Sequence, residues 1–225
     1  MKPTNEEIKR KAVQCKVADM FENDVSEYID FAFYLLENKI ESENIFILAG
    51  LSADEKDDAR KYFEIVVSEL NIQTDADNAD FIYVCYLNEK IYEGKRDAQT
   101  ALSKLSGLYI SENKELFSDF YDLLILIEDY FYLGNIEPIK NMNEYIKRFF
   151  EFFIKFYYME LPKDFYKQAY CKFCGKRVIP AKKSFFGKTK YIQFCPNCRK
   201  KNVKDWAYCK YNSGKELYLK EIGGQ

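Results

Sequence analysis

Histidine is absent from this chain of 225 residues, and tryptophan occurs once. The absence of histidine excludes a Ser-His-Asp triad, the H-E-x-x-H zinc motif and every other site that needs an imidazole. Proline and glycine are also scarce, with 5 and 9 residues. Few residues therefore interrupt helices, and many of the common catalytic constellations are ruled out.

Long apolar runs are missing as well. The longest wholly aliphatic stretch, Leu123 to Ile127, is far shorter than the roughly 20 residues that span a bilayer. The first residues carry acid where a secretory signal needs an apolar core. The number of cysteines is odd, at 7, so no disulfide framework is implied. We therefore expect a cytoplasmic protein in a reducing compartment, without a membrane partner.

The net charge of −2 conceals two halves of opposite sign. Residues 1–162 carry 18 Lys and Arg against 32 Asp and Glu, or −14. Residues 163–225 carry 16 against 4, or +12. We therefore expect two domains, an acidic, aromatic-rich domain at residues 1–162 and a basic domain at residues 163–225. Such a split indicates an interaction surface on one of the halves.

The acidic half shows apolar residues at spacings of three and four, the pattern of amphipathic helices. We expect an all-helical domain, so the chain as a whole is mainly α with a small β region after it. Ser52 and Glu55 fit a capping box, and Gly94, Gly107 and Gly134 stand where helices should end. The expected helices cover residues 6–21, 25–38, 44–51, 53–70, 76–92, 97–105, 112–133 and 143–160.

The helix expected at residues 143–160 has an unusually wide apolar surface. Burying one aromatic ring contributes about 1.5–3 kcal/mol, so this surface would be costly to leave in water. We expect the helix to lie in a core, and the alternative is a docking face for another protein. Its polar side chains fall on one stripe, made by Glu144, Arg148, Glu151 and Lys155.

The basic half contains two C-x-x-C pairs, Cys171 with Cys174 and Cys195 with Cys198, separated by 20 residues. Two intervening residues let a tight turn present both sulfurs to one ion, and two such turns complete a tetrahedron. Gly175 supplies backbone freedom after the first pair. A redox dithiol is the competing interpretation, but it belongs at a helix start in a βαβ unit, which this region lacks.

Residues 184–194, between the two pairs, are typical of a β-hairpin with a glycine at its turn, and residues 206–211 suit a third strand. Over residues 168–211 the chain resembles a zinc ribbon, a small three-stranded module with two C-x-x-C knuckles. Arg199 departs from the common glycine after the second pair. The resemblance implies one structural Zn²⁺, with four thiolates and no open position, on Cys171, Cys174, Cys195 and Cys198.

Three further cysteines lie outside these pairs. We expect Cys15 and Cys85 in the core of the helical domain. Cys209 is expected to be a small buried side chain of the third strand, and the alternative is that it replaces one of the four metal ligands.

Cations and aromatic rings alternate around this metal motif. Cations beside stackable rings suit single-stranded or structured nucleic acid. The alternative is that the lysines are the ordinary solvated coat of a small module, balanced by the acidic helices. The candidate nucleic-acid-binding residues are Lys182, Lys183, Lys188, Lys190, Arg199, Lys200, Lys201 and Lys204.

No catalytic constellation accompanies the metal motif, so we expect a non-enzymatic, zinc-stabilised binding protein that recognises a macromolecular partner. The stretches Ile45 to Leu51 and Asn88 to Gly94 resemble those of small bacterial helical proteins of toxin immunity or phage defence. A protein partner is favoured, because an acidic surface suits a basic protein.

Two other functions stay open at this point. One is a nucleic-acid-binding regulator that uses the basic ribbon. The other is a metal-dependent hydrolase, in which carboxylates would hold Mg²⁺. The carboxylates considered for this role are Asp54, Asp57, Asp58, Glu128 and Asp129.

Overall fold

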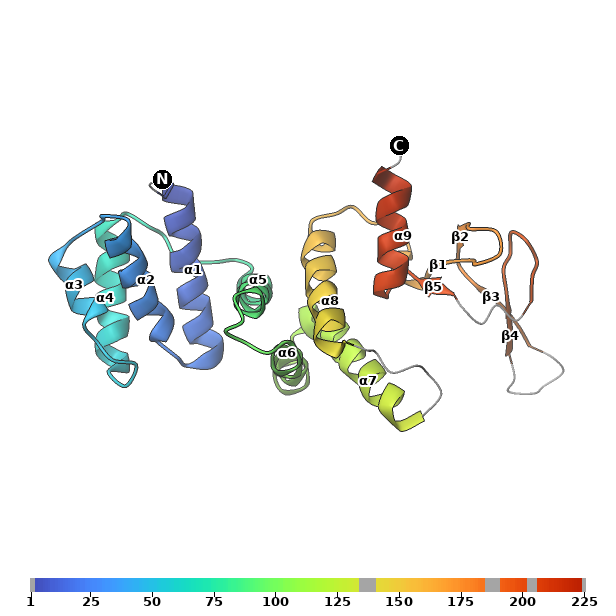
Figure 1. Cartoon of the computed structure of the whole chain (residues 1–225), viewed down its shortest axis with the longest axis horizontal. Helices are drawn as coiled ribbons and strands as arrows, with labels where there is room; N and C mark the ends of the chain where they lie inside the picture. Colours follow the sequence, from blue (N-terminus) through green and yellow to red (C-terminus); the bar gives the residue numbers. More distant parts are fainter. Residues whose placement is uncertain (1–2, 134–140, 185–190, 202–205, 224–225) are drawn as a thin grey trace. The chain divides into compact units, whose positions relative to one another are not determined.

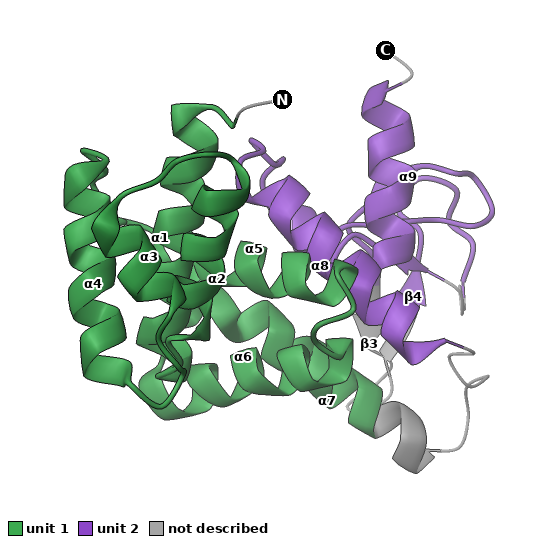
Figure 2. Ribbon diagram, turned by 60° about the vertical axis from the view of Figure 1, so that its left-hand side comes forward, with its two compact units in different colours: residues 1–138 green, residues 139–225 purple. Residues whose placement is uncertain are grey.

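The structure is a computed structural model that describes residues 3–133, 141–184, 191–201 and 206–223, without the side chains of residues 129–133, 182–184, 191 and 192. The chain divides into two compact units, Met1–Pro138 and Ile139–Gln225 (Figure 2). The first carries 14 Lys and Arg against 29 Asp and Glu, or −15, and the second 20 against 7, or +13. The division therefore precedes the change of charge at residue 162.

The described part of the N-terminal unit is helical throughout (Figure 1). Each helix expected there from the sequence is present, which confirms the mainly α prediction. A short 3-10 helix, η1 (Glu115–Phe117), separates the last two helices. The helices are α1 (Asn5–Glu22), α2 (Ser26–Glu37), α3 (Glu43–Ala49), α4 (Lys56–Glu69), α5 (Ala79–Tyr92), α6 (Ala98–Glu112) and α7 (Ser118–Leu133).

The glycines expected to end helices behave differently from one another. Gly94 follows α5 with a φ of 70°, as expected. Gly107 instead lies inside α6, which continues to Asn113, where a left-handed residue with a φ of 54° ends the helix. The expectation of a stop at Gly107 is wrong because one glycine weakens a helix by only about 1 kcal/mol. Gly134 lies outside the described residues.

The capping box occurs at a different helix from the one expected. At the start of α1, the Thr4 hydroxyl accepts a hydrogen bond from the Glu7 N–H, and the Glu7 carboxylate accepts one from the Thr4 N–H. At Ser52 only half of this pattern forms, because both its N–H and its hydroxyl donate to the Glu55 carboxylate. As a result α4 begins at Lys56, three residues later than the sequence predicts.

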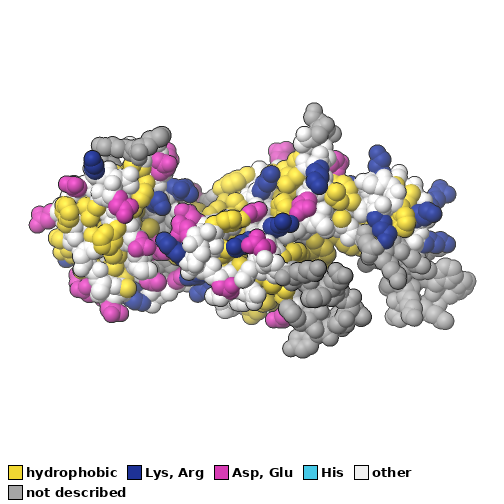
Figure 3. All heavy atoms as spheres, viewed as in Figure 1, with side chains coloured by type: hydrophobic (Ala, Val, Ile, Leu, Met, Phe, Trp, Pro, Cys, Tyr) yellow, Lys and Arg dark blue, Asp and Glu magenta, His cyan; other side chains and the backbone are white. Residues whose placement is uncertain are grey.

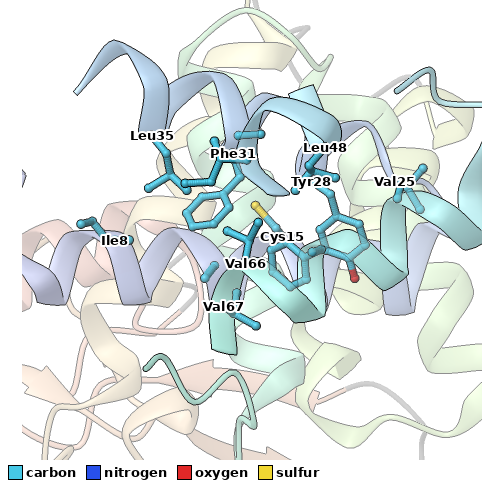
Figure 4. Packing of buried hydrophobic residues seen from close by; sticks show 14 residues of the cluster. Ile8, Cys15, Val25, Tyr28, Phe31, Leu35, Leu48, Val66 and Val67 are labelled. Carbon is cyan, nitrogen blue, oxygen red and sulfur yellow. The ribbon is translucent and has the colours of Figure 1, made fainter. Parts of the chain in front are cut away.

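The first core of the N-terminal unit lies between α1, α2, α3 and α4. It consists of 14 buried residues, of which Figure 4 shows the packing. Tyr28 of α2 stacks on Phe63 of α4, with ring centroids 4.0 Å apart. Cys15 is buried in the same cluster, which confirms its expected place, whereas Cys85 is only half-buried.

Three carboxylates of α1 and α2 connect these helices to α4, to α5 and to the segment after α5 by a repeated arrangement, which we call a carboxylate lock. In each lock, one carboxylate accepts hydrogen bonds from a tyrosine hydroxyl and from a cationic side chain. Glu22 receives the Tyr83 hydroxyl at 2.7 Å and both Arg96 Nη atoms, at 2.5 and 2.6 Å. The locks are Asp19 with Tyr28 and Arg60, Glu22 with Tyr83 and Arg96, and Glu27 with Tyr86 and Lys90.

The C-terminal unit combines two long helices, a short 3-10 helix and short strands (Figure 1). β1 is the centre of a three-stranded antiparallel sheet in the order β2-β1-β5, and β3 pairs with β4 in a separate sheet. The two strands paired here cover residues 181–184 and 191–194, while the expected turn with its glycine lies outside the described residues. The expected third strand is present at residues 207–208 and pairs with β1. The elements are α8 (Met142–Tyr157), η2 (Phe165–Lys167), β1 (Ala169–Tyr170), β2 (Arg177–Val178), β3 (Ala181–Ser184), β4 (Tyr191–Phe194), β5 (Ala207–Tyr208) and α9 (Asn212–Gly223).

The α8 helix has the polar stripe that the sequence predicts. The four stripe residues, Glu144, Arg148, Glu151 and Lys155, are all exposed. Phe149, Phe150, Phe153 and Phe156 on its other side are buried. Because Phe156 enters the core of the C-terminal unit, this helix supplies the apolar surface that the basic segment has too little of.

One buried cluster of the C-terminal unit is aromatic and contains five described residues: Phe156, Phe165, Tyr170, Cys209 and Tyr218. The α9 helix, which the sequence analysis did not predict, closes it. This helix approaches β5 closely at Gly214, where a Cβ atom would lie 2.2 Å from the Tyr208 carbonyl oxygen. Only glycine therefore fits at this contact.

Lys215, the residue after Gly214, is 1% exposed. Its Nζ lies 4.7 Å from the centroid of the Phe149 ring and 5.7 Å from the centroids of Phe156 and Tyr166. Aromatic faces attract a cation electrostatically, which offsets part of its desolvation cost.

The described helices also differ from membrane-spanning segments. None of them combines the length and the apolar character needed to cross a bilayer.

Candidate metal centre

The two C-x-x-C pairs fold into the same turn, which we call a knuckle. In the first knuckle, the Cys171 N–H donates to the Lys176 carbonyl at 3.1 Å and the Gly175 N–H to the Cys171 carbonyl at 2.8 Å. The second knuckle repeats both bonds 24 residues later, with the same distances, from Cys195 to Lys200 and from Arg199 to Cys195. The backbone therefore builds one structure twice.

The left-handed position after each pair shows the same equivalence. Gly175 has a φ of 66°, and Arg199 has a φ of 57° at the corresponding place in the second knuckle. The second knuckle thus forms the same turn with arginine in place of glycine. A residue with a side chain in the left-handed region lowers the stability of the fold by about 1–2 kcal/mol.

The two knuckles bring their four sulfur atoms together. All four lie within 4.8 Å of one another, and the Cys171–Cys198 and Cys174–Cys195 pairs are 3.8 Å apart. A tetrahedron with Zn–S bonds of about 2.3 Å has edges of about 3.8 Å. The cysteines predicted as ligands therefore lie at the spacing that a single tetrahedral metal ion such as Zn²⁺ requires.

The surroundings act on two of the sulfurs in opposite directions. The Lys200 backbone lowers the pKa of the Cys198 thiol, but burial and the neighbouring cysteines outweigh it and raise that pKa to about 11. Cys171 and Cys195 are buried, and Cys174 and Cys198 are half-buried. Hydrogen bonds from the Lys176 backbone, and then from the Asn197 side chain at 3.5 Å, lower the pKa of the Cys174 thiol to about 6. Asn197 belongs to the opposite knuckle, so it also orients one sulfur relative to the other pair.

The sulfur cluster lies in a second small apolar group of the C-terminal unit. Ala169, Cys171, Cys195 and Trp206 form its buried part, and Trp206 is 8% exposed. Residues alternate along β1, since Tyr170 enters the aromatic cluster while its two neighbours face the sulfurs. This strand thus joins the metal centre to the aromatic cluster.

Cys209 is not part of the four-sulfur group. It lies in the aromatic cluster and is fully buried, and its N–H donates to the Gln168 carbonyl at 2.9 Å. Burial raises the pKa of its thiol to about 11, which disfavours a thiolate. The expectation of a small buried side chain is therefore confirmed, and substitution for a ligand is not.

The candidate nucleic-acid-binding residues fall into three groups. Arg199, Lys200 and Lys201 are exposed and follow the second knuckle. Lys182 and Lys183 pair with Gln193 and Ile192 along β3 and β4, and their side chains are outside the described part. The remaining candidates, Lys188, Lys190 and Lys204, lie outside the described residues altogether.

The first knuckle adds exposed residues that the sequence analysis left out, namely Lys172, Phe173 and Lys176. Their signal in the sequence is the repeat of the knuckle, which gives Lys176 the same position as Lys200. Arg177, the next cation, is not free, because it donates to the Glu221 carboxylate at 3.0 and 3.2 Å. Together with the Tyr170 hydroxyl, this pair forms a fourth carboxylate lock.

Within the described residues, the four cysteines are the only group of three or more potential ligands that converge. The carboxylates Asp54, Asp57, Asp58 and Glu128 do not form such a group, and the Asp129 side chain lies outside the described part. Comparisons with protein-family models, with curated proteins and with solved structures give no match for this chain. Its function must therefore be inferred from the residues themselves.

Proposed function

We propose that this chain is a non-enzymatic binding protein whose C-terminal unit is a zinc ribbon with one structural Zn²⁺. The observation that carries the proposal is the set of four sulfurs at tetrahedral spacing, with cross-knuckle distances of 3.8 Å. A site with four thiolates has no open position for water or substrate, so it stabilises structure and does not activate a nucleophile.

The partner in this proposal is a basic protein that contacts the acidic N-terminal unit. Asp and Glu side chains are spread over the helices of this unit in the view of Figure 3. The unit carries 29 Asp and Glu against 14 Lys and Arg. Charge of one sign steers a partner of the opposite sign and speeds the encounter. The proposal includes the location and the role expected from the sequence: a cytoplasmic protein that acts in bacterial toxin immunity or phage defence.

Native mass spectrometry of the protein isolated from its host tests both parts. We expect one zinc ion per chain and a stoichiometric basic protein whose complex dissociates as ionic strength rises. The zinc part fails if carefully prepared protein contains less than one equivalent of metal. The partner part fails if no stoichiometric protein co-purifies at low salt.

A further inference from the structure

One aromatic ring at the metal centre is left exposed by the fold. Phe173 lies between the first pair of cysteines and is 54% exposed. The Lys172 Nζ is 5.5 Å from its ring centroid. The turn does not need this ring, because the equivalent position in the second knuckle is Asn197. A large exposed ring with no role in packing is a candidate contact residue.

Exposed cations accompany both knuckles because the turn repeats. Lys176 and Lys200 hold the same position, two residues after the second cysteine of each pair, and Arg199 and Lys201 flank Lys200. All four side chains are exposed, and none of them forms an ion pair with a described residue. Figure 3 shows Lys and Arg side chains gathered over the described ribbon. The close sulfurs bring together the two knuckles that carry these cations.

We propose that the two knuckles form a binding surface for single-stranded nucleic acid. Phe173 stacks on an unpaired base, and Lys176, Lys200 and Lys201 contact phosphates. The exposed ring favours single-stranded nucleic acid over other polyanions. A duplex hides the faces of its bases, and the charged side chains of an acidic protein do not stack on a ring. This inference rests on the proposed zinc centre, which keeps the knuckles together.

Fluorescence anisotropy with the full-length, zinc-loaded protein tests the proposal. The probes are a labelled single-stranded RNA of about 20 nucleotides, the same sequence as single-stranded DNA, its duplex, and labelled poly-glutamate. We expect both single strands to bind, with affinity that falls as salt rises, and the duplex and poly-glutamate to bind at least about fivefold more weakly.

Two variants separate stacking from charge. Phe173→Leu keeps an apolar side chain but removes the ring, and should weaken single-strand binding by about fivefold or more. The double substitution Lys176→Glu with Lys200→Glu should weaken the salt dependence: the negative slope of log affinity against log salt should become shallower by about one unit or more. The matched control, Lys163→Glu with Lys220→Glu, changes the net charge equally at exposed sites outside the knuckles and should keep most of the affinity.

The outcomes are distinguishable. Poly-glutamate binding as tightly as RNA would assign the surface to an acidic protein, and unchanged binding by Phe173→Leu would remove the stacking role; either result overturns the inference. Zinc analysis of the same samples separates it from the proposed function. One zinc without single-strand binding defeats only the inference. Ring-dependent binding by protein with less than one zinc defeats the proposed zinc centre and leaves the surface standing.

Discussion

The two units of this chain are stabilised in different ways. The N-terminal unit buries a cluster of 14 side chains among four helices and adds three carboxylate locks. Among the described residues, the C-terminal unit has one cluster of five buried side chains and a second of four, two of which are cysteines, besides buried rings of α8 such as Phe149 and Phe150. A small apolar core rarely suffices alone, and a metal is a common supplement. The comparison predicts that the N-terminal unit depends on burial and that the C-terminal unit depends in addition on a metal ion bound by its four sulfurs.

The carboxylate locks do not distinguish the two units, because both units contain them. The lock of Glu221 with Tyr170 and Arg177 in the C-terminal unit has the same components as the locks of the N-terminal unit. Both units therefore contain this electrostatic arrangement, and they differ in how their buried side chains are grouped. The following changes test this contrast, from the largest expected effect to the smallest.

Cys195→Ser should have the largest effect, and only in the C-terminal unit. Loss of one thiolate forfeits most of the roughly 10–16 kcal/mol that structural zinc sites contribute. We expect zinc content to fall below one equivalent, the emission of Trp206 to shift, and most helical circular dichroism to remain. Cys209→Ser is the control and should retain zinc. Retention of one zinc ion with unshifted emission in Cys195→Ser would refute the assignment.

Glu22→Gln should destabilise the N-terminal unit by about 2–3 kcal/mol. It leaves the Arg96 guanidinium, 25% exposed, without its charged partner. Urea denaturation followed by circular dichroism measures the loss, and zinc content should not change. Glu6→Gln, at an exposed site on the same helix, should alter stability by less than about 0.5 kcal/mol. Equal effects of the two substitutions would mean that the lock contributes nothing specific.

Gly214→Ala should destabilise the docking of α9 by about 1–3 kcal/mol, because the new Cβ atom requires β5 and α9 to separate. Denaturation monitored by Trp206 fluorescence reports this change in the C-terminal unit. Gly107→Ala, where a Cβ atom meets nothing within 4 Å, should instead stabilise α6 by about 0.5–1 kcal/mol. A neutral Gly214→Ala would show that the close approach has no energetic consequence.

Alkaline pH should weaken the N-terminal unit through its lock tyrosines. Burial, followed by the nearby carboxylates, raises the pKa of Tyr28, Tyr83 and Tyr86. The folded chain keeps these protons when the unfolded chain has lost them, so stability is complete below about pH 10 and falls above it. The slope should be up to about 1.4 kcal/mol per pH unit for each tyrosine, and smaller in Tyr83→Phe. Urea titrations at successive pH values would contradict this if stability stayed constant above pH 10.

Arg199→Gly should have the smallest effect, a stabilisation of about 1 kcal/mol or less. The substitution removes the strain of a side chain at a left-handed backbone position. Glycine loses more conformational entropy on folding, which offsets part of the gain in stability. Thermal denaturation of the zinc-loaded protein measures the difference. Gly175→Ala, at the equivalent position, should destabilise by a similar amount. If both substitutions act in the same direction, the two knuckles are not energetically equivalent.

The sequence predicts the metal centre better than the unit that contains it. The C-x-x-C spacing fixes a local turn, so the convergence of the four predicted ligands follows from the chain alone. The α9 helix does not follow, because its contact with β5 depends on the absence of a side chain at Gly214. The burial of Lys215 depends on rings from α8 and η2, which no local pattern reveals. The predicted helix boundaries are wrong where Gly107 was expected to end a helix and where Ser52 was expected to begin one, since other residues take these roles.

The repeated knuckle has a consequence for how this protein can change. Its shape depends on backbone hydrogen bonds and sulfur positions, and of the residues inside the two pairs of cysteines only Asn197 adds a side-chain bond to a sulfur. Lys172, Phe173 and Pro196 can therefore diverge under selection without loss of the scaffold. A new binding specificity would need only a few codon changes at these three sites.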